Sequence, residues 1–177
     1  MRTLVLGGIR SGKSLWAEAA ATAAAGDDVP VRYLATGPTA DSDGSWARRV
    51  RAHQARRPAH WRTVETADLA VDLRAASDTA TLVDDIGGWL TAIMDRLGAW
   101  SGASVHHEVD ALTAAVEGFA APLVLVSPEV GLTVVPATEA GRRFADELGT
   151  VNQRLAAVCD RVVLVVAGQP LTVKEPS

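Results

Sequence analysis

The sequence predicts an α/β fold in which a mostly parallel sheet is covered by helices on both faces. Short apolar runs with many β-branched residues alternate with longer helical stretches along the chain. Several of these runs are nearly continuous, as expected of parallel strands that helices bury on both sides. Near the N-terminus, a strand-like run leads directly into a glycine-rich loop and then into an alanine-rich stretch. These three observations indicate strand–helix–strand units.

The expected strands follow from apolar content and from the turn residues that flank it. The first run ends at two glycines, and the third ends at two aspartates. The fourth ends at Ser127 and Pro128, which begin a turn-rich segment. In chain order, the predicted strands are 3–6, 31–35, 80–83, 123–126, 162–166 and 171–173.

The expected helices lie between these strands. The first is rich in alanine, the residue with the highest helix propensity. The second stops at Pro58, because proline lacks an N–H and disfavours helical backbone in the residue before it. In chain order, the predicted helices are 13–25, 42–57, 67–75, 89–97, 104–119 and 140–159.

Length and composition restrict the class of protein. A chain of 177 residues is expected to form one domain, residues 1–177. The net charge of −4 argues against a nucleic-acid-binding domain.

Cys159 is the only cysteine, so a disulfide framework and a thiolate zinc cluster are excluded, and its apolar neighbours predict burial. No run approaches the about 20 apolar residues that span a bilayer, and no signal-peptide core is present, so we expect a cytoplasmic protein.

Residues 7–14 carry the spacing G-x-x-x-x-G-K-S, the signature of a P-loop. In a P-loop, backbone N–H groups surround phosphates, and glycines allow the close approach. Lys13 would reach the outer phosphates, and the Ser14 hydroxyl would hold Mg²⁺. The alternative is an ordinary glycine-rich turn, but the strand before the loop and the helix after it favour a nucleotide site. The fold is therefore predicted to be a single P-loop NTPase-type domain.

Asp84 and Asp85 follow the third predicted strand. A P-loop enzyme needs a carboxylate near the serine to hold Mg²⁺, and the carboxyl end of a strand is the right edge of the sheet for it. The alternative role is an N-cap for the next helix. The position relative to the strand leaves open which aspartate binds the metal.

The segment 48–57 holds five arginines in an otherwise acidic chain. On a helix, Arg49, His53 and Arg57 would share one face, and guanidinium groups bind phosphate oxygens well. Neighbouring positive charge would keep the imidazole neutral and nucleophilic, able to attack phosphorus. A solvated basic face is the competing interpretation, and the residues alone do not decide between the two.

Together these motifs resemble one family, the bifunctional adenosylcobinamide kinase / adenosylcobinamide-phosphate guanylyltransferases of cobalamin biosynthesis. The resemblance runs nearly end to end. Residues 7–14 resemble G-G-x-R-S-G-K-S, 33–36 resemble Y-[IL]-A-T, 49–53 resemble R-I-x-x-H, and 57–65 resemble R-P-x-x-W-x-T-x-E. Further on, 84–91 resemble part of D-C-L-T-x-W-L-T-N, and 126–153 resemble V-S-N-E-V-G…V-P…R-x-F…G…N-Q.

The resemblance implies two transfers at one site: phosphorylation of adenosylcobinamide with ATP or GTP, then transfer of GMP from GTP to the product, giving adenosylcobinamide-GDP. It implies that His53 is the GMP-accepting nucleophile and Lys13 a second catalytic residue. It favours Asp84 over Asp85 as the carboxylate that holds Mg²⁺ with Ser14, and it implies a homotrimer. The implied nucleotide contacts are Gly7, Gly8, Ile9, Arg10, Ser11, Gly12, Lys13, Ser14, Ala35, Thr36, Gly37, Gln54, Ala55, Arg56, Arg57, Glu65 and Asp84.

Three positions depart from the family pattern. Pro128 stands where the pattern has asparagine, residues 85–88 depart from the C-L-T stretch, and Ala145 stands where arginine is usual. Two other functions compete with the bifunctional enzyme. One is a P-loop kinase for another small molecule without guanylyl transfer, and the other is a nucleotide-dependent switch or assembly protein.

Overall fold

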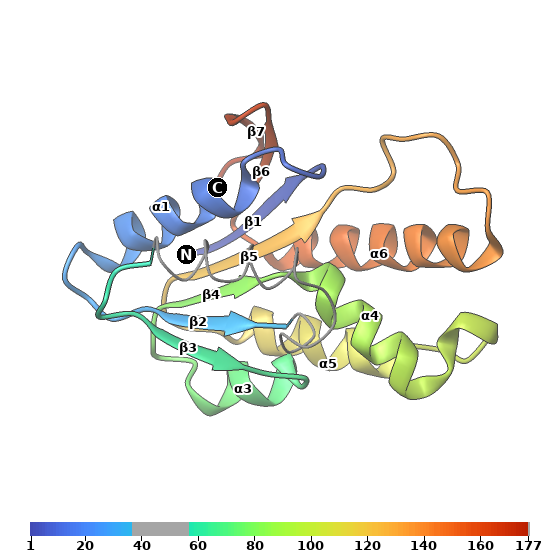
Figure 1. Ribbon diagram of the computed structural model, residues 1–177. Coiled ribbons are helices and arrows are strands. Elements are labelled where there is room, and N and C mark those ends of the chain that lie inside the picture. The colour runs from blue at the N-terminus through green and yellow to red at the C-terminus, as the bar shows by residue number, and fades with distance from the viewer. Residues whose placement is uncertain (37–56, 177) are drawn as a thin grey trace.

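A computed structural model of the chain describes residues 1–36 and 57–176, and within them seven strands form one sheet in the order β3-β2-β4-β5-β1-β6-β7 (Figure 1). Every neighbouring pair is parallel except β6 and β7, which form an antiparallel hairpin at one edge. The strands are β1 (Arg2–Gly7), β2 (Arg32–Ala35), β3 (Arg62–Glu65), β4 (Thr81–Asp84), β5 (Leu123–Pro128), β6 (Arg161–Val166) and β7 (Gln169–Lys174).

The helices of residues 1–36 and 57–176 divide unequally between the two faces of the sheet. One face packs against α1, in a core that includes Ala17, Val5 and Tyr33. The other face carries a larger layer made of the remaining α-helices (Figure 1). The helices are α1 (Lys13–Ala25), α3 (Leu69–Ala75), α4 (Ile86–Leu97), α5 (His106–Glu117) and α6 (Glu139–Val158), with a short 3-10 turn η1 (Ala99–Ser101). No helix in 1–36 or 57–176 is long and apolar enough to span a membrane.

The predicted fold class is confirmed, and the helix 13–25 has the predicted bounds. Most other predicted elements in the described residues shift by one or two residues at their ends, and two features differ more. The strand β3 was not expected: its residues are mostly exposed, and it is a strand because it pairs with β2 at the edge of the sheet. The helix α4 begins at Ile86 rather than 89, because the Asp85 side chain caps it by accepting from the Gly88 N–H. Most of the predicted helix 42–57 lies outside the described residues.

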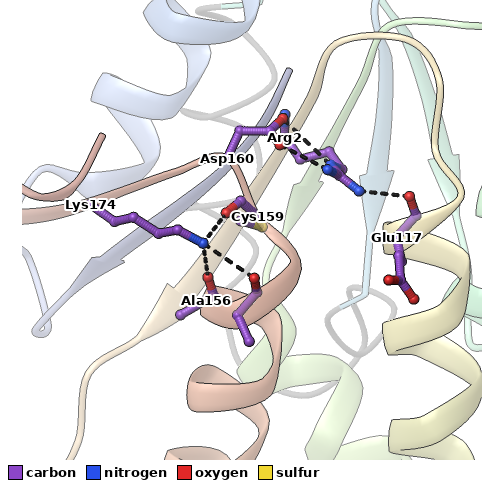
Figure 2. A network of polar contacts seen from close by, with 7 residues as sticks. Arg2, Glu117, Ala156, Cys159, Asp160 and Lys174 are labelled. Atoms are coloured by element: carbon purple, nitrogen blue, oxygen red, sulfur yellow. Dashed lines mark hydrogen bonds and ion pairs between the residues drawn. The ribbon is translucent and has the colours of Figure 1, made fainter. Parts of the chain in front are cut away.

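The amino ends of the central strands are closed by a network of charged groups (Figure 2). Arg2 and Asp160 form an ion pair with 2.8 Å between Nη2 and Oδ1, and Arg2 also donates to the Glu117 carbonyl. Lys174 Nζ donates to the carbonyls of Ala156, Ala157 and Cys159, the last turn of α6. Cys159 is buried as predicted, and burial raises the pKa of its thiol to about 12.

Candidate nucleotide site

The glycine-rich loop joins β1 to α1 at the carboxyl edge of the sheet. An added Cβ at Gly7 would meet the Ser11 hydroxyl and would lie 2.8 Å from the Val165 carbonyl, so only glycine fits there. Gly12 has a φ of 94°, in the left-handed region that glycine adopts without strain. Arg10 also has positive φ, at 57°. These conformations turn the backbone of the loop sharply before α1 begins.

The first turn of α1 offers positive charge and N–H groups. Its N-cap is Gly12, which provides no side chain to accept hydrogen bonds from these groups, and no acidic residue occupies the first turn. Lys13 Nζ donates to the Gly8 carbonyl at 3.2 Å, within the loop. Ile9 is 94% exposed, so the loop is open to solvent. An anion such as a phosphate is the group that a helix start of this kind binds.

The β6–β7 hairpin supports the loop from the side. Its turn residues Ala167 and Gly168 both have positive φ, as a type I′ hairpin turn requires. The Gly168 N–H donates to the Ser11 carbonyl at 2.7 Å, and the Gly168 Cα would lie 3.1 Å from a Cβ at Gly12. The second glycine of the motif therefore also allows the hairpin to pack closely.

Asp84 is the aspartate that faces the P-loop. The Ser14 hydroxyl lies 3.4 Å from its Oδ1, and the Tyr33 hydroxyl donates to its Oδ2 at 2.6 Å. No group of three or more His, Cys, Asp or Glu side chains among the described residues could hold a metal by itself. A hydroxyl beside a carboxylate nevertheless fits Mg²⁺, which prefers oxygen and takes its other ligands from water and substrate phosphates.

Asp85 has a different position. Its side chain accepts from the Gly88 N–H at 2.7 Å as the N-cap of α4, and burial raises the pKa of this carboxyl. Its backbone carbonyl accepts from the Thr36 hydroxyl, which ties the end of β2 to the start of α4. The N-cap role thus falls on Asp85, and Asp84 is the aspartate beside Ser14, so its metal role stays a prediction.

Arg57 and Tyr33 stack beside Asp84. The Arg57 guanidinium carbon lies 3.3 Å from the centre of the Tyr33 ring, and its Nη1 donates to the Thr63 hydroxyl at 2.9 Å. Burial and the nearby Asp84 carboxylate both raise the pKa of Tyr33, so its hydroxyl is protonated and acts as the donor.

The sheet register brings several predicted site residues together. Ala35 pairs with Glu65 on one side and with Asp84 on the other, so three strand ends lie in a row. Glu65 is exposed there, next to Thr36 at the end of the neighbouring strand. The residues Gly37, His53, Gln54, Ala55 and Arg56 lie outside the described residues, so the predicted nucleophile and its neighbours remain predictions.

Sequence reasoning missed two contacts at this edge. The first is the contact between Tyr33 and Asp84, because the sequence motif alone gave Tyr33 no role. Its position two residues before the end of the predicted strand was the available signal. The second contact is between Gly87 and Pro128, two positions at which the sequence departs from the family pattern. A Cβ at Gly87 would lie 2.8 Å from the Pro128 ring. The Pro128 ring thus occupies space that a side chain at 87 would need. Nothing in the sequence alone places these two positions together.

Comparisons with known proteins agree with this geometry. The family model described as cobinamide kinase / cobinamide phosphate guanyltransferase matches residues 3–173. The chain is 41% identical to the bifunctional adenosylcobalamin biosynthesis protein CobP of Pseudomonas aeruginosa, over 98% of each chain. It is 39% identical to the bifunctional adenosylcobalamin biosynthesis protein CobU of Salmonella typhimurium, and 37% identical to that of Escherichia coli. These two similarities cover 98% of this chain and the full length of the relatives.

Proposed function

Because the chain belongs to the cobinamide kinase / cobinamide phosphate guanyltransferase family, we propose that it is an adenosylcobinamide kinase and adenosylcobinamide-phosphate guanylyltransferase of cobalamin biosynthesis. The observation that carries this function is the pairing of a P-loop with a facing carboxylate, Asp84 opposite Ser14. In this proposal residues 1–177 act as one domain.

In the kinase step, the loop N–H groups and Lys13 hold a nucleoside triphosphate. The hydroxyl of adenosylcobinamide attacks the γ-phosphorus, the bond to the β–γ bridging oxygen breaks, and the nucleoside diphosphate and a proton leave. Ser14 and Asp84 would hold Mg²⁺, which when bound neutralises charge on the β- and γ-phosphates. Positioning and charge neutralisation supply most of the catalysis in such transfers.

In the guanylyl step, His53 is the nucleophile. Its ring nitrogen attacks the α-phosphorus of GTP, the bond to the α–β bridging oxygen breaks, and pyrophosphate leaves. A phosphate oxygen of adenosylcobinamide phosphate then attacks the same phosphorus and releases His53, which yields adenosylcobinamide-GDP. Contacts with the nucleotide come from the P-loop, from the strand ends at Ala35, Thr36 and Glu65, and from the stretch 54–57.

Assembly and location belong to the same proposal. We infer a homotrimer in the cytoplasm, which agrees with aliphatic side chains exposed on the described surface: Leu132, Val134, Val135, Leu171 and Val173. Light scattering on the purified protein tests the trimer, and a monomer at micromolar concentration would contradict it.

Labelled GTP tests the two transfers separately. Label in the γ-position should appear on adenosylcobinamide, whereas label in the α-position should stay on the denatured protein, survive alkali and be released by acid. The variant His53→Ala should lose the α-label and His60→Ala, at an exposed position, should keep it. Undiminished α-label in His53→Ala would overturn the role of His53. A kinase without guanylyl transfer retains no α-label, and a switch protein also shows no turnover that depends on corinoid.

A further inference from the structure

The Asp84 carboxylate is held at both oxygens, each by a different element. Oδ1 lies 3.4 Å from the Ser14 hydroxyl at the start of α1, whereas Oδ2 accepts from the Tyr33 hydroxyl on β2 at 2.6 Å. The second contact is the shorter one, and its donor is 2% exposed. A carboxylate fixed in this way has a defined rotation, so the same oxygen always faces Ser14.

The Tyr33 ring is itself fixed on both sides. One side packs into the core below α1 with Val5, Ala17 and Leu82, and the Arg57 guanidinium covers the ring at 3.3 Å. Arg57 is anchored in turn by its bond to the Thr63 hydroxyl on β3. A chain of contacts therefore runs from β3 through Arg57 and Tyr33 to Asp84.

We propose that Tyr33 is a positioning residue for the metal-binding carboxylate of the kinase step, with Arg57 holding the Tyr33 ring in place. This inference rests on the proposed function, since it requires Ser14 and Asp84 to bind Mg²⁺. Groups that orient a metal ligand from behind typically change metal affinity about 10- to 100-fold when they are removed. Tyr33 thus sets how strongly the site binds Mg²⁺ and has little effect on how it binds nucleotide without metal.

The test compares Mg²⁺ dependence in Tyr33→Phe and in the wild type. Calorimetric titration of GTP in EDTA should give dissociation constants within about twofold of each other, because the P-loop is unchanged. The Mg²⁺ concentration for half-maximal phosphorylation of adenosylcobinamide, and for half-maximal enhancement of GTP binding, should rise about tenfold in the variant. The same Mg²⁺ dependence as in the wild type would overturn the inference.

Two further variants make the outcomes distinguishable. Thr81→Val removes a buried hydroxyl from the other end of β4, where it donates to the Thr79 carbonyl, and should leave the Mg²⁺ dependence unchanged. Asp84→Asn should shift the Mg²⁺ dependence more than Tyr33→Phe does. If Asp84→Asn has no effect, the proposed metal role of Asp84 fails. If Asp84→Asn shifts the dependence and Tyr33→Phe does not, only the positioning role fails.

A second measurement needs no substitution at Tyr33. Tyr33 is the single tyrosine of the chain, so protein labelled with 3-fluorotyrosine gives one ¹⁹F resonance. Adding Mg²⁺ to the GDP complex should shift this resonance in the wild type and should leave it unshifted in Asp84→Asn. A resonance that does not respond to Mg²⁺ in the wild type would contradict contact between Tyr33 and the metal ligand.

Discussion

At the amino edge of the sheet, charged side chains bond to fixed groups of the protein, whereas at the carboxyl edge the Lys13 ammonium lies within an exposed glycine-rich loop. Arg2 pairs with Asp160, and Lys174 caps the carbonyls that end α6 (Figure 2). Lys13, in contrast, donates to a carbonyl of its own glycine-rich loop. A phosphate bound in the loop can replace the carbonyl at Lys13, whereas the Arg2 guanidinium already has an anionic partner in Asp160. We therefore expect charge at the amino edge to serve stability and charge at the carboxyl edge to serve phosphate binding.

The substitution Lys13→Met should have the largest effect on activity. It removes the cation that holds the outer phosphates, so kcat/KM for phosphorylation should fall about 10²- to 10³-fold. The free energy of unfolding should change by less than about 0.5 kcal/mol, because the side chain is partly exposed and packs little. Kinase assays and urea unfolding measure the two quantities. A large loss of stability in Lys13→Met would remove the distinction between the edges.

The substitution Gly87→Thr should have the next largest effect, and it acts on packing at the carboxyl edge. A side chain at 87 collides with the Pro128 ring, so the free energy of unfolding should fall by about 1–3 kcal/mol. Adding Pro128→Asn should recover most of the loss, since it removes the ring. Urea unfolding of both single variants and the double variant gives the coupling. Purely additive effects would show that the two positions do not depend on each other.

The substitution Lys174→Met should lower the free energy of unfolding by about 1 kcal/mol, since three carbonyls at the end of α6 lose their donor. The aliphatic stem is kept, so packing changes little. Both transfer activities should stay within about twofold of the wild type, because Lys174 lies at the opposite edge from the P-loop. An activity loss above tenfold would show that the two edges are coupled.

The smallest effect concerns pH. The Arg2 side chain and backbone N–H hold the pKa of Asp160 below its usual range. A carboxyl whose pKa is lower in the folded state stabilises the fold above its unfolded pKa of about 3.9, and this contribution disappears as the pH falls through the folded pKa. Asp160→Asn should therefore lower the free energy of unfolding by under about 1 kcal/mol at pH 7. The difference from the wild type should become progressively smaller as the pH falls below about 4. Urea unfolding at several pH values measures this difference. Asp28→Asn, at an exposed position, makes the same change in net charge and is the control.

The residues that carry a local signal could be predicted, and the contacts between distant segments could not. The helix Lys13–Ala25 follows from alanine content, and the site at 7–14 follows from spacing. Strand β3 has mostly exposed residues and depends on its pairing with β2, so no local pattern reveals it. The roles of Tyr33 and of the Gly87–Pro128 contact depend on sheet register and on side-chain reach. Both arise only when the strands are assembled.

The contact between Ser11 and Gly168 has a consequence for synthesis of the chain. The P-loop leaves the ribosome well before the β6–β7 hairpin, yet the N–H that bonds its Ser11 carbonyl belongs to residue 168. Strands β5 and β6, which pair with β1 on either side, are also made late. Contacts so distant in sequence form only after the loops between them have closed. We therefore expect nucleotide binding to require the assembled sheet, and a nascent chain that ends before the β6–β7 hairpin would lack the support for its own phosphate loop.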